Sequence, residues 1–146
     1  MAYQRILVAI DLTDEAEEVL AAAMDQASYQ ETRELHLITV VKPLHHTHGG
    51  LDMGAVSASV NLDKQLHDRA RETLDQLANE HQIARDHTHL TSGNPAAEIK
   101  ACAEEIQADL IVIGTHGRHG LGLLLGSTAN GVLHGVACDV LTVRIH

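Results

Sequence analysis

Short apolar runs alternate along the chain with longer stretches in which apolar residues recur every three or four positions. The run RILVAID is rich in β-branched residues and predicts a strand buried on both faces, and the runs ELHLITVV, DLIVIG and DVLTVRI predict three further strands. A fifth run, DHTHLTSG, is short and polar and predicts a strand near an edge of the sheet. DLIVIG is the most apolar run, so we expect it to lie centrally.

Four amphipathic segments separate these runs. The second carries an apolar stripe from Leu62 to Leu77 and predicts a long helix. The third opens with Asn94 as a helix N-cap and Pro95 at the first helical position. The last begins at Ser127, and its inward-facing residues are expected to be Val132, Leu133 and Val136.

The strict alternation of strands and helices predicts an α/β fold. Such a pattern gives a parallel sheet with helices on both faces, joined by right-handed crossovers. The length suits a single domain, which we place at residues 1–146. One segment lacks any period and contains several glycines, and it predicts a mobile loop at about residues 43–60.

Charge and composition narrow the class of partner. The formal net charge is −10, with ten Lys and Arg residues, no Phe and no Trp. This balance argues against a nucleic-acid partner, since phosphate neutralisation supplies most of that affinity, and against anionic membranes. Cys102 and Cys138 lie in apolar surroundings with no metal or redox spacing, so we interpret them as reduced thiols of a cytoplasmic protein. No apolar segment approaches the length that spans a bilayer, and Asp11 interrupts the first run too early for a signal peptide.

The fold class predicts where a ligand would bind. In parallel α/β sheets, ligands bind at the carboxyl ends of strands where the strand order reverses. The ends of the first and fourth strands, at Asp11 and Gly114, are the natural pair. The glycine-rich stretch GTHGRHGLGLLLGSTANG, residues 114–131, begins at this point.

Two interpretations of the glycine-rich stretch are open on chemistry alone. Its glycines lack a Cβ and let the backbone approach a ligand, and Gly126, Ser127 and Thr128 offer N–H groups and hydroxyls at a helix start, as a phosphate requires. The same residues also suit a simple tight turn. The stretch contains no lysine, so it is not a Walker-type phosphate loop.

The sequence resembles the universal stress protein family from Arg5 to Ile145. The resemblance is carried by ILVAID, GNPAAEI, DLIVIGTHGRHG, LLLGSTANGVL and CDVLTVR. It implies an open five-stranded parallel sheet with strand order 3-2-1-4-5. It also implies a homodimer that forms through the last strand, here Val140–Ile145.

The resemblance further implies an adenine nucleotide site, because nucleotide-binding members carry G-x2-G-x9-G-[ST] and an aspartate after the first strand. Here the aspartate would lie near adenine or ribose, the first glycine pair would wrap the ribose and α-phosphate, and the later residues would hold the distal phosphates. The cofactor would be ATP or a related nucleotide, with Mg²⁺ or Mn²⁺ to offset its charge. The residues so implied are Ala9, Asp11, Val40, Gly114, Thr115, His116, Gly117, Arg118, Gly126, Ser127 and Thr128.

The spacing departs from the family pattern at one point. Eight residues, not nine, lie between Gly117 and Gly126. One residue spans at most about 3.3–3.6 Å, more than a hydrogen bond tolerates. A local tightening at Gly120 and Gly122 would absorb the difference, and we expect the two halves of the site to align on one nucleotide.

Three functions are compatible with these observations. The first is a stress-response regulatory protein that binds an adenine nucleotide and acts on an unidentified protein partner. The second is a dimeric interaction module that needs no nucleotide, in which Asp11 only ends a strand. The third is a slow ATPase or phosphotransferase, but His116 and His119 show no nucleophile or orienting partner, so we assign no catalytic residue.

The HHTH segment invites a metal interpretation. Imidazole clusters bind Zn, Cu and Ni. A flexible loop without cysteine or fixed outer partners rarely forms a resident site, so we predict none at His45, His46 and His48.

Overall fold

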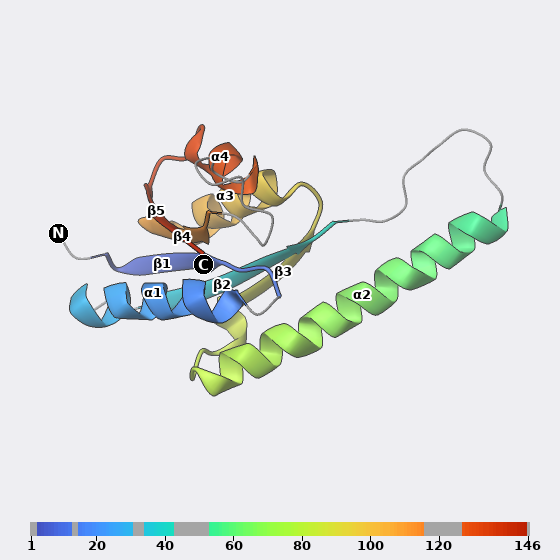
Figure 1. The fold of residues 1–146 in the computed structure, drawn as a ribbon, viewed down its shortest axis with the longest axis horizontal. Coiled ribbons are helices and arrows are strands. Elements are labelled where there is room, and N and C mark those ends of the chain that lie inside the picture. Colours follow the sequence, from blue (N-terminus) through green and yellow to red (C-terminus); the bar gives the residue numbers. More distant parts are fainter. Residues whose placement is uncertain (1–2, 13–14, 31–33, 43–52, 116–126, 146) are drawn as a thin grey trace.

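Five parallel strands form one sheet in the order β3-β2-β1-β4-β5 (Figure 1). The computed structural model describes residues 3–12, 15–30, 34–42, 53–115 and 127–145. The predicted α/β class and strand order are confirmed. The strands are β1 (Arg5–Ala9), β2 (Glu34–Val41), β3 (Thr88–Ser92), β4 (Leu110–Gly114) and β5 (Asp139–Val143).

Helices cover both faces of the sheet, as expected for parallel strands joined by crossovers. Helices α1 (Ala16–Gln30) and α2 (Met53–Glu80) lie on one face, while α3 (Pro95–Ile106) and α4 (Ser127–Leu133) lie on the other (Figure 1). A short 3₁₀ turn, η1 (Arg85–His87), leads into β3.

Strand alternation divides the core into two layers. In β1, Ile6 and Val8 face α1 and α2, whereas Leu7 and Ala9 face α3 and α4. All four side chains are buried, which explains why the sequence of an interior strand shows no polar alternation. DLIVIG is interior as predicted, although the middle position belongs to β1, and the polar β3 is an edge strand as predicted.

The amino ends of β1 and β4 are joined by one carboxylate. The Asp109 side chain accepts hydrogen bonds from the backbone N–H groups of Gln4 and Arg5, at 2.9 and 3.0 Å. The Asp109 N–H in turn donates to the Arg5 carbonyl at 3.0 Å. These bonds set the register in which Ile6 lies opposite Leu110.

Helix α2 begins earlier than the sequence pattern predicted. We expected an irregular segment to about residue 60, but the helix already begins at Met53. The segment MGAVSAS has no apolar stripe to reveal a helix. Helix propagation costs little once the strongly periodic segment after it has nucleated. Residues 43–52, with His45, His46 and His48, lie outside the described residues.

Only the carboxyl half of the α2 stripe packs on the sheet. Leu74, Leu77 and Ala78 are buried, whereas Leu62 is 46% exposed. A helix of 28 residues is about 42 Å long, and the five-residue strand β3 covers less than half of that length. The helix therefore extends beyond the sheet (Figure 1). No helix in the described part of the chain is both long and apolar enough to cross a membrane.

Helix α4 buries a different face from the one predicted. Ala129 and Val132 are buried, but Leu133 is 41% exposed. Adjacent helical residues point about 100° apart, so the narrow contact of a seven-residue helix cannot include both positions 132 and 133. Val136, beyond the end of the helix, packs against the same core as expected.

Candidate functional site

A cavity of about 410 Å³ lies at the carboxyl ends of β1, β2 and β4. Its position is the one that the fold class predicted. Seven of the residues implied by the family resemblance line it: Ala9, Asp11, Val40, Gly114, Thr115, Ser127 and Thr128. The other four, His116, Gly117, Arg118 and Gly126, lie outside the described residues.

Backbone hydrogen bonds carry the chain from the strands into the cavity wall. The Ile10 N–H donates to the Ile38 carbonyl at 3.0 Å and extends the β1–β2 pairing by one residue. The Thr115 N–H donates to the Val143 carbonyl at 2.8 Å and does the same for β4 and β5. Asp11, which is exposed, therefore emerges beside the end of β4.

The cavity has an apolar floor and a polar rim. Ile38, Ile99 and Ile113 form part of the floor and are each at most 5% exposed. The rim carries a carboxylate from Asp11 and hydroxyls that include that of Thr128. An apolar surface with a few convergent polar groups suits a small ligand that has an apolar part and hydrogen-bonding substituents.

Gly114 makes room for a side chain of the protein itself. A Cβ at this position would lie 2.5 Å from Ile145 Cδ1 and 3.1 Å from Val19 Cγ2. The sequence suggested that this glycine lets the backbone approach a ligand. The structure shows that the missing Cβ lets Ile145 pack against the end of β4.

Several lining residues were missed by the sequence analysis. Lys42 follows β2 directly and is the cation among the described lining residues. The sequence feature that could have identified Lys42 is its position as the first charged residue after an apolar strand. Pro95 and Ile99 come from α3, and Ile145 from beyond β5; no local pattern connects these residues with Asp11.

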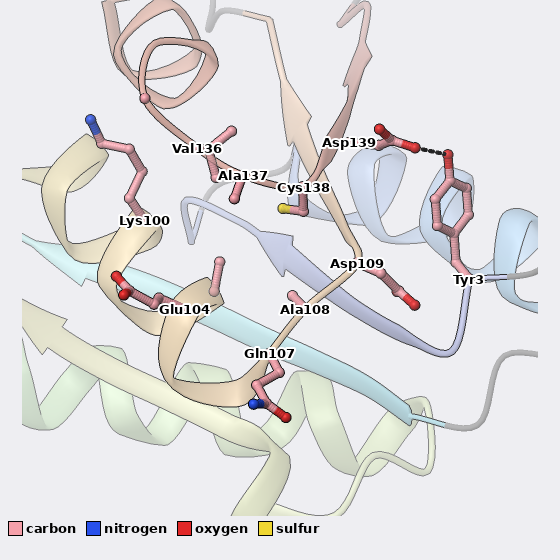
Figure 2. Close-up of a pocket in the computed structure, with 12 residues that line it drawn as sticks. Tyr3, Lys100, Glu104, Gln107, Ala108, Asp109, Val136, Ala137, Cys138 and Asp139 are labelled. Atoms are coloured by element: carbon pink, nitrogen blue, oxygen red, sulfur yellow. Dashed lines mark hydrogen bonds between the residues drawn. The ribbon is translucent and has the colours of Figure 1, made fainter.

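A larger cavity of about 880 Å³ lies at the opposite end of the strands, between α3 and the segment that precedes β5 (Figure 2). Several polar groups around it make structural bonds. The Tyr3 hydroxyl donates to Asp139 Oδ2 at 2.7 Å, and Lys100 Nζ donates to the His134 carbonyl at 3.0 Å. The Asp109 carboxylate accepts hydrogen bonds from the Gln4 and Arg5 backbone N–H groups. Burial raises the pKa of the Cys138 thiol, which keeps this thiol protonated. We therefore consider the smaller cavity the candidate site.

Comparisons with known proteins agree with this fold. The model of the universal stress protein family matches residues 2–144. Universal stress protein A homolog 2 of Coxiella burnetii is 38% identical over 143 residues, which cover 98% of this chain and 96% of that protein. The structure of UspA from Lactobacillus plantarum has the same fold, with a TM-score of 0.71 at 24% identity and 99% of each chain covered.

A second solved structure is that of a universal stress protein in complex with cAMP. It is 26% identical and has a TM-score of 0.60, and the match covers 99% of this chain and 98% of that one. The family match over nearly the whole sequence and the identity to the Coxiella burnetii protein lead to one conclusion. The chain belongs to the universal stress protein family.

Proposed function

We propose that the protein is a stress-response regulatory protein that binds an adenine nucleotide, of the ATP or AMP type, in the 410 Å³ cavity. The observation that carries this proposal is the gathering of Asp11, Thr115 and Thr128 around an apolar floor at the carboxyl ends of β1 and β4. The complex of a related protein with cAMP supports the choice of an adenine nucleotide.

Each part of the nucleotide has a matching part of the cavity. The adenine ring would pack between the apolar side chains near Ala9 and Val40, and Asp11 would accept hydrogen bonds from ribose or adenine. The hydroxyls of Ser127 and Thr128 would bind phosphate oxygens. Lys42, with Mg²⁺ or Mn²⁺, would offset part of the phosphate charge.

Ligand-dependent melting tests this proposal directly. At a nucleotide concentration about 100-fold above the dissociation constant, binding stabilises the folded state by about 2.7 kcal/mol. For a domain of this size the melting temperature should rise by about 5–11 °C. ATP, AMP and cAMP, each with and without Mg²⁺, are compared by differential scanning fluorimetry. No shift with any of them at millimolar concentration would contradict the proposal.

A pair of aspartate variants locates the binding. Asp11→Asn removes a charged acceptor and should weaken nucleotide binding about 10- to 150-fold, the worth of a hydrogen bond to a charged group. Asp25→Asn makes the same chemical change at an exposed position on α1 and should leave the affinity unchanged. Equal affinities in the two variants would place the nucleotide elsewhere.

We further propose that the protein forms a homodimer through the outer edge of β5, by way of Val140–Ile145. In the described residues β5 pairs with β4 alone. The Asp139 N–H and the Val143 carbonyl both bond toward β4. Strand alternation then directs the N–H of Thr142 away from β4, where it could donate a hydrogen bond to a backbone carbonyl of a second copy.

Two substitutions at one position test this dimer. Thr142→Pro removes the outward N–H and should give a monomer in light scattering, while Thr142→Val keeps the N–H and should remain dimeric. A nucleotide-independent interaction module predicts the same dimer but no melting shift with nucleotide. The two experiments therefore separate the two functions.

A further inference from the structure

Three imidazoles and one carboxylate meet at the β2–β3 edge of the sheet, near the amino end of β2 and away from the nucleotide cavity. His36 Nε2 lies 3.0 Å from Glu34 Oε2, and His36 Nδ1 lies 3.0 Å from His89 Nε2. The ring of His87 stacks on that of His36, with centroids 4.2 Å apart and planes inclined by 23°. Glu34, His36 and His87 each offer a ligand atom within 4.8 Å of the other two, although the stacked His87 ring would have to turn for its nitrogen to point at an ion shared with His36.

The sheet brings these residues together from two distant segments. Glu34 and His36 are two residues apart on β2, so their side chains lie on the same face. His87 and His89 are likewise two residues apart, at the junction of η1 and β3. Parallel pairing places Ile38 opposite His89, which brings the two pairs side by side. The positions are therefore held by strand pairing.

We propose that Glu34, His36 and His87 bind a divalent transition-metal ion of the Zn²⁺ type. Zn²⁺ takes imidazole nitrogen and carboxylate oxygen at about 2.0–2.2 Å, so neighbouring ligand atoms of a tetrahedral site lie about 3.3 Å apart. The 3.0 Å between Glu34 and His36 is already close to that separation. Three protein ligands would leave the fourth position to water.

The remaining histidine, His89, supplies a hydrogen-bond partner for the ring of His36. A ligating histidine usually donates its other ring N–H to an acceptor, which fixes the tautomer and aims the ligating nitrogen. His36 Nδ1 has such a partner in His89 Nε2. His89 Nε2 can accept that hydrogen bond when the His89 ring carries its proton on Nδ1. His36 itself is 6% exposed, so its own side chain is shielded from bulk solvent.

The charges around Glu34 and its exposure to solvent fit a site that binds a metal ion reversibly. The Glu34 carboxylate lies beside the Arg5 guanidinium and the His36 ring and is an anion at neutral pH. Arg5 shares this carboxylate, with Nε 2.8 Å from Oε2 and Nη2 3.3 Å from Oε1. That neighbouring cation lowers the affinity for a metal ion below that of a carboxylate with no such neighbour. The Glu34 side chain is 34% exposed and gives an ion a path from solvent.

The bound ion would connect β2 to the turn that precedes the edge strand. Glu34 and His36 lie on β2, and His87 lies in η1. The site would therefore stabilise the β3 edge whenever the ion is present, independently of nucleotide at the other end of the sheet.

Metal binding is tested with protein that carries no affinity tag. Co²⁺ serves as a spectroscopic probe, because imidazole–carboxylate coordination gives visible absorption bands, and Zn²⁺ is titrated by calorimetry. We expect one ion per chain at about 10 µM free Zn²⁺ or below, and a rise in melting temperature that a chelator reverses. Absence of both the Co²⁺ bands and the Zn²⁺ heat at that concentration would overturn the proposal.

Variants with matched controls locate the ion. His87→Ala should weaken Zn²⁺ binding at least 10-fold and abolish the Co²⁺ bands, with an unchanged circular dichroism spectrum. His81→Ala removes an imidazole from the exposed group Glu17, Glu80 and His81, and it should leave binding unchanged. A combined alanine variant of His45, His46 and His48 should also leave it unchanged. If either control abolishes binding, or His87→Ala does not weaken it, the site is not the one proposed.

Ring NMR of the wild-type chain keeps the proposal testable even where a variant fails to fold. Histidine ¹H–¹⁵N correlations should shift for His36, His87 and His89 when Zn²⁺ is added. Shifts confined to other histidines would contradict the assignment.

Discussion

Replacing Gly114 with alanine should destabilise the protein chiefly through its contact with Ile145, with a smaller contribution from Val19. Gly114 is not among the described glycines with positive φ, so alanine can adopt its backbone conformation. The new Cβ, however, would lie 2.5 Å from Ile145 Cδ1 and 3.3 Å from Ile145 Cγ1. Overpacking of this kind costs about 1–3 kcal/mol. Alanine regains about 0.5–1 kcal/mol of the backbone entropy that glycine loses on folding.

A double-mutant cycle isolates this contact. Ile145→Ala removes the two Ile145 carbons and leaves only the 3.1 Å approach to Val19 Cγ2, so Gly114→Ala should then cost less than it does in the wild type. Unfolding in urea measures all four proteins, and we expect a coupling energy of about 1–3 kcal/mol between the two positions. Gly131→Ala is the control, because its Cβ would meet Ala96 Cβ at 2.7 Å and not Ile145. Coupling below about 0.5 kcal/mol between Gly114 and Ile145 would refute the packing role assigned to this glycine.

Three further substitutions or reactions probe single features of the fold. Asn94→Ala removes the side-chain oxygen that accepts the Ala97 N–H at 3.0 Å, and it should lower the free energy of unfolding in urea by about 1 kcal/mol. Thr91→Val should raise the free energy of unfolding by about 1 kcal/mol, because among the described residues the buried Thr91 hydroxyl has no hydrogen-bond partner. A loss of stability in this variant would show that the hydroxyl has a partner. Burial raises the pKa of the Cys102 thiol to about 11 from 9, so at pH 8 its thiolate fraction is about 100-fold below that in the unfolded chain. The greater nucleophilicity of a high-pKa thiolate offsets about 10-fold of this difference. Cys102 is also only 5% exposed, so iodoacetamide should alkylate it at least about 10-fold more slowly in the folded protein, with a rate still rising above pH 9. Equal rates in folded and urea-unfolded protein would contradict this.

Patterns that repeat along a strand or helix could be predicted from sequence. The order of elements followed from the alternation of apolar runs and helical stripes, and the cap at Asn94 followed from residue type alone. The strand order came from the family resemblance. The cavity at Asp11 and Gly114 followed from the general behaviour of parallel sheets.

Features that depend on distant packing could not be predicted. Whether Leu62 is buried depends on how far the neighbouring strands reach, and the exposure of Leu133 depends on where α3 contacts α4. Lys42 and Ile145 reach the cavity only because β2 and the segment after β5 end at the same edge of the sheet. No local pattern contains that information.

The histidine cluster shows a signal that was present but was not used. Glu34 and His36 are spaced by two residues, which places both on one face of β2, and His87 and His89 have the same spacing across the junction of η1 and β3. The HHTH segment drew attention because its histidines are adjacent in sequence. Spacing that matches the strand period is the sequence feature that indicates the convergence of Glu34 and His36.

The position of β1 in the middle of the sheet has a consequence for synthesis on the ribosome. One edge of β1 pairs with β2, but the other pairs with β4, and its amino end is held by Asp109, which is translated about a hundred residues later. At about 5–20 residues per second, the nascent chain would carry this apolar strand with an open edge for about 5–20 seconds. An unpaired apolar edge can add a strand from another chain. The interval between the synthesis of β1 and that of β4 is therefore the one in which this edge is open to a strand from another chain.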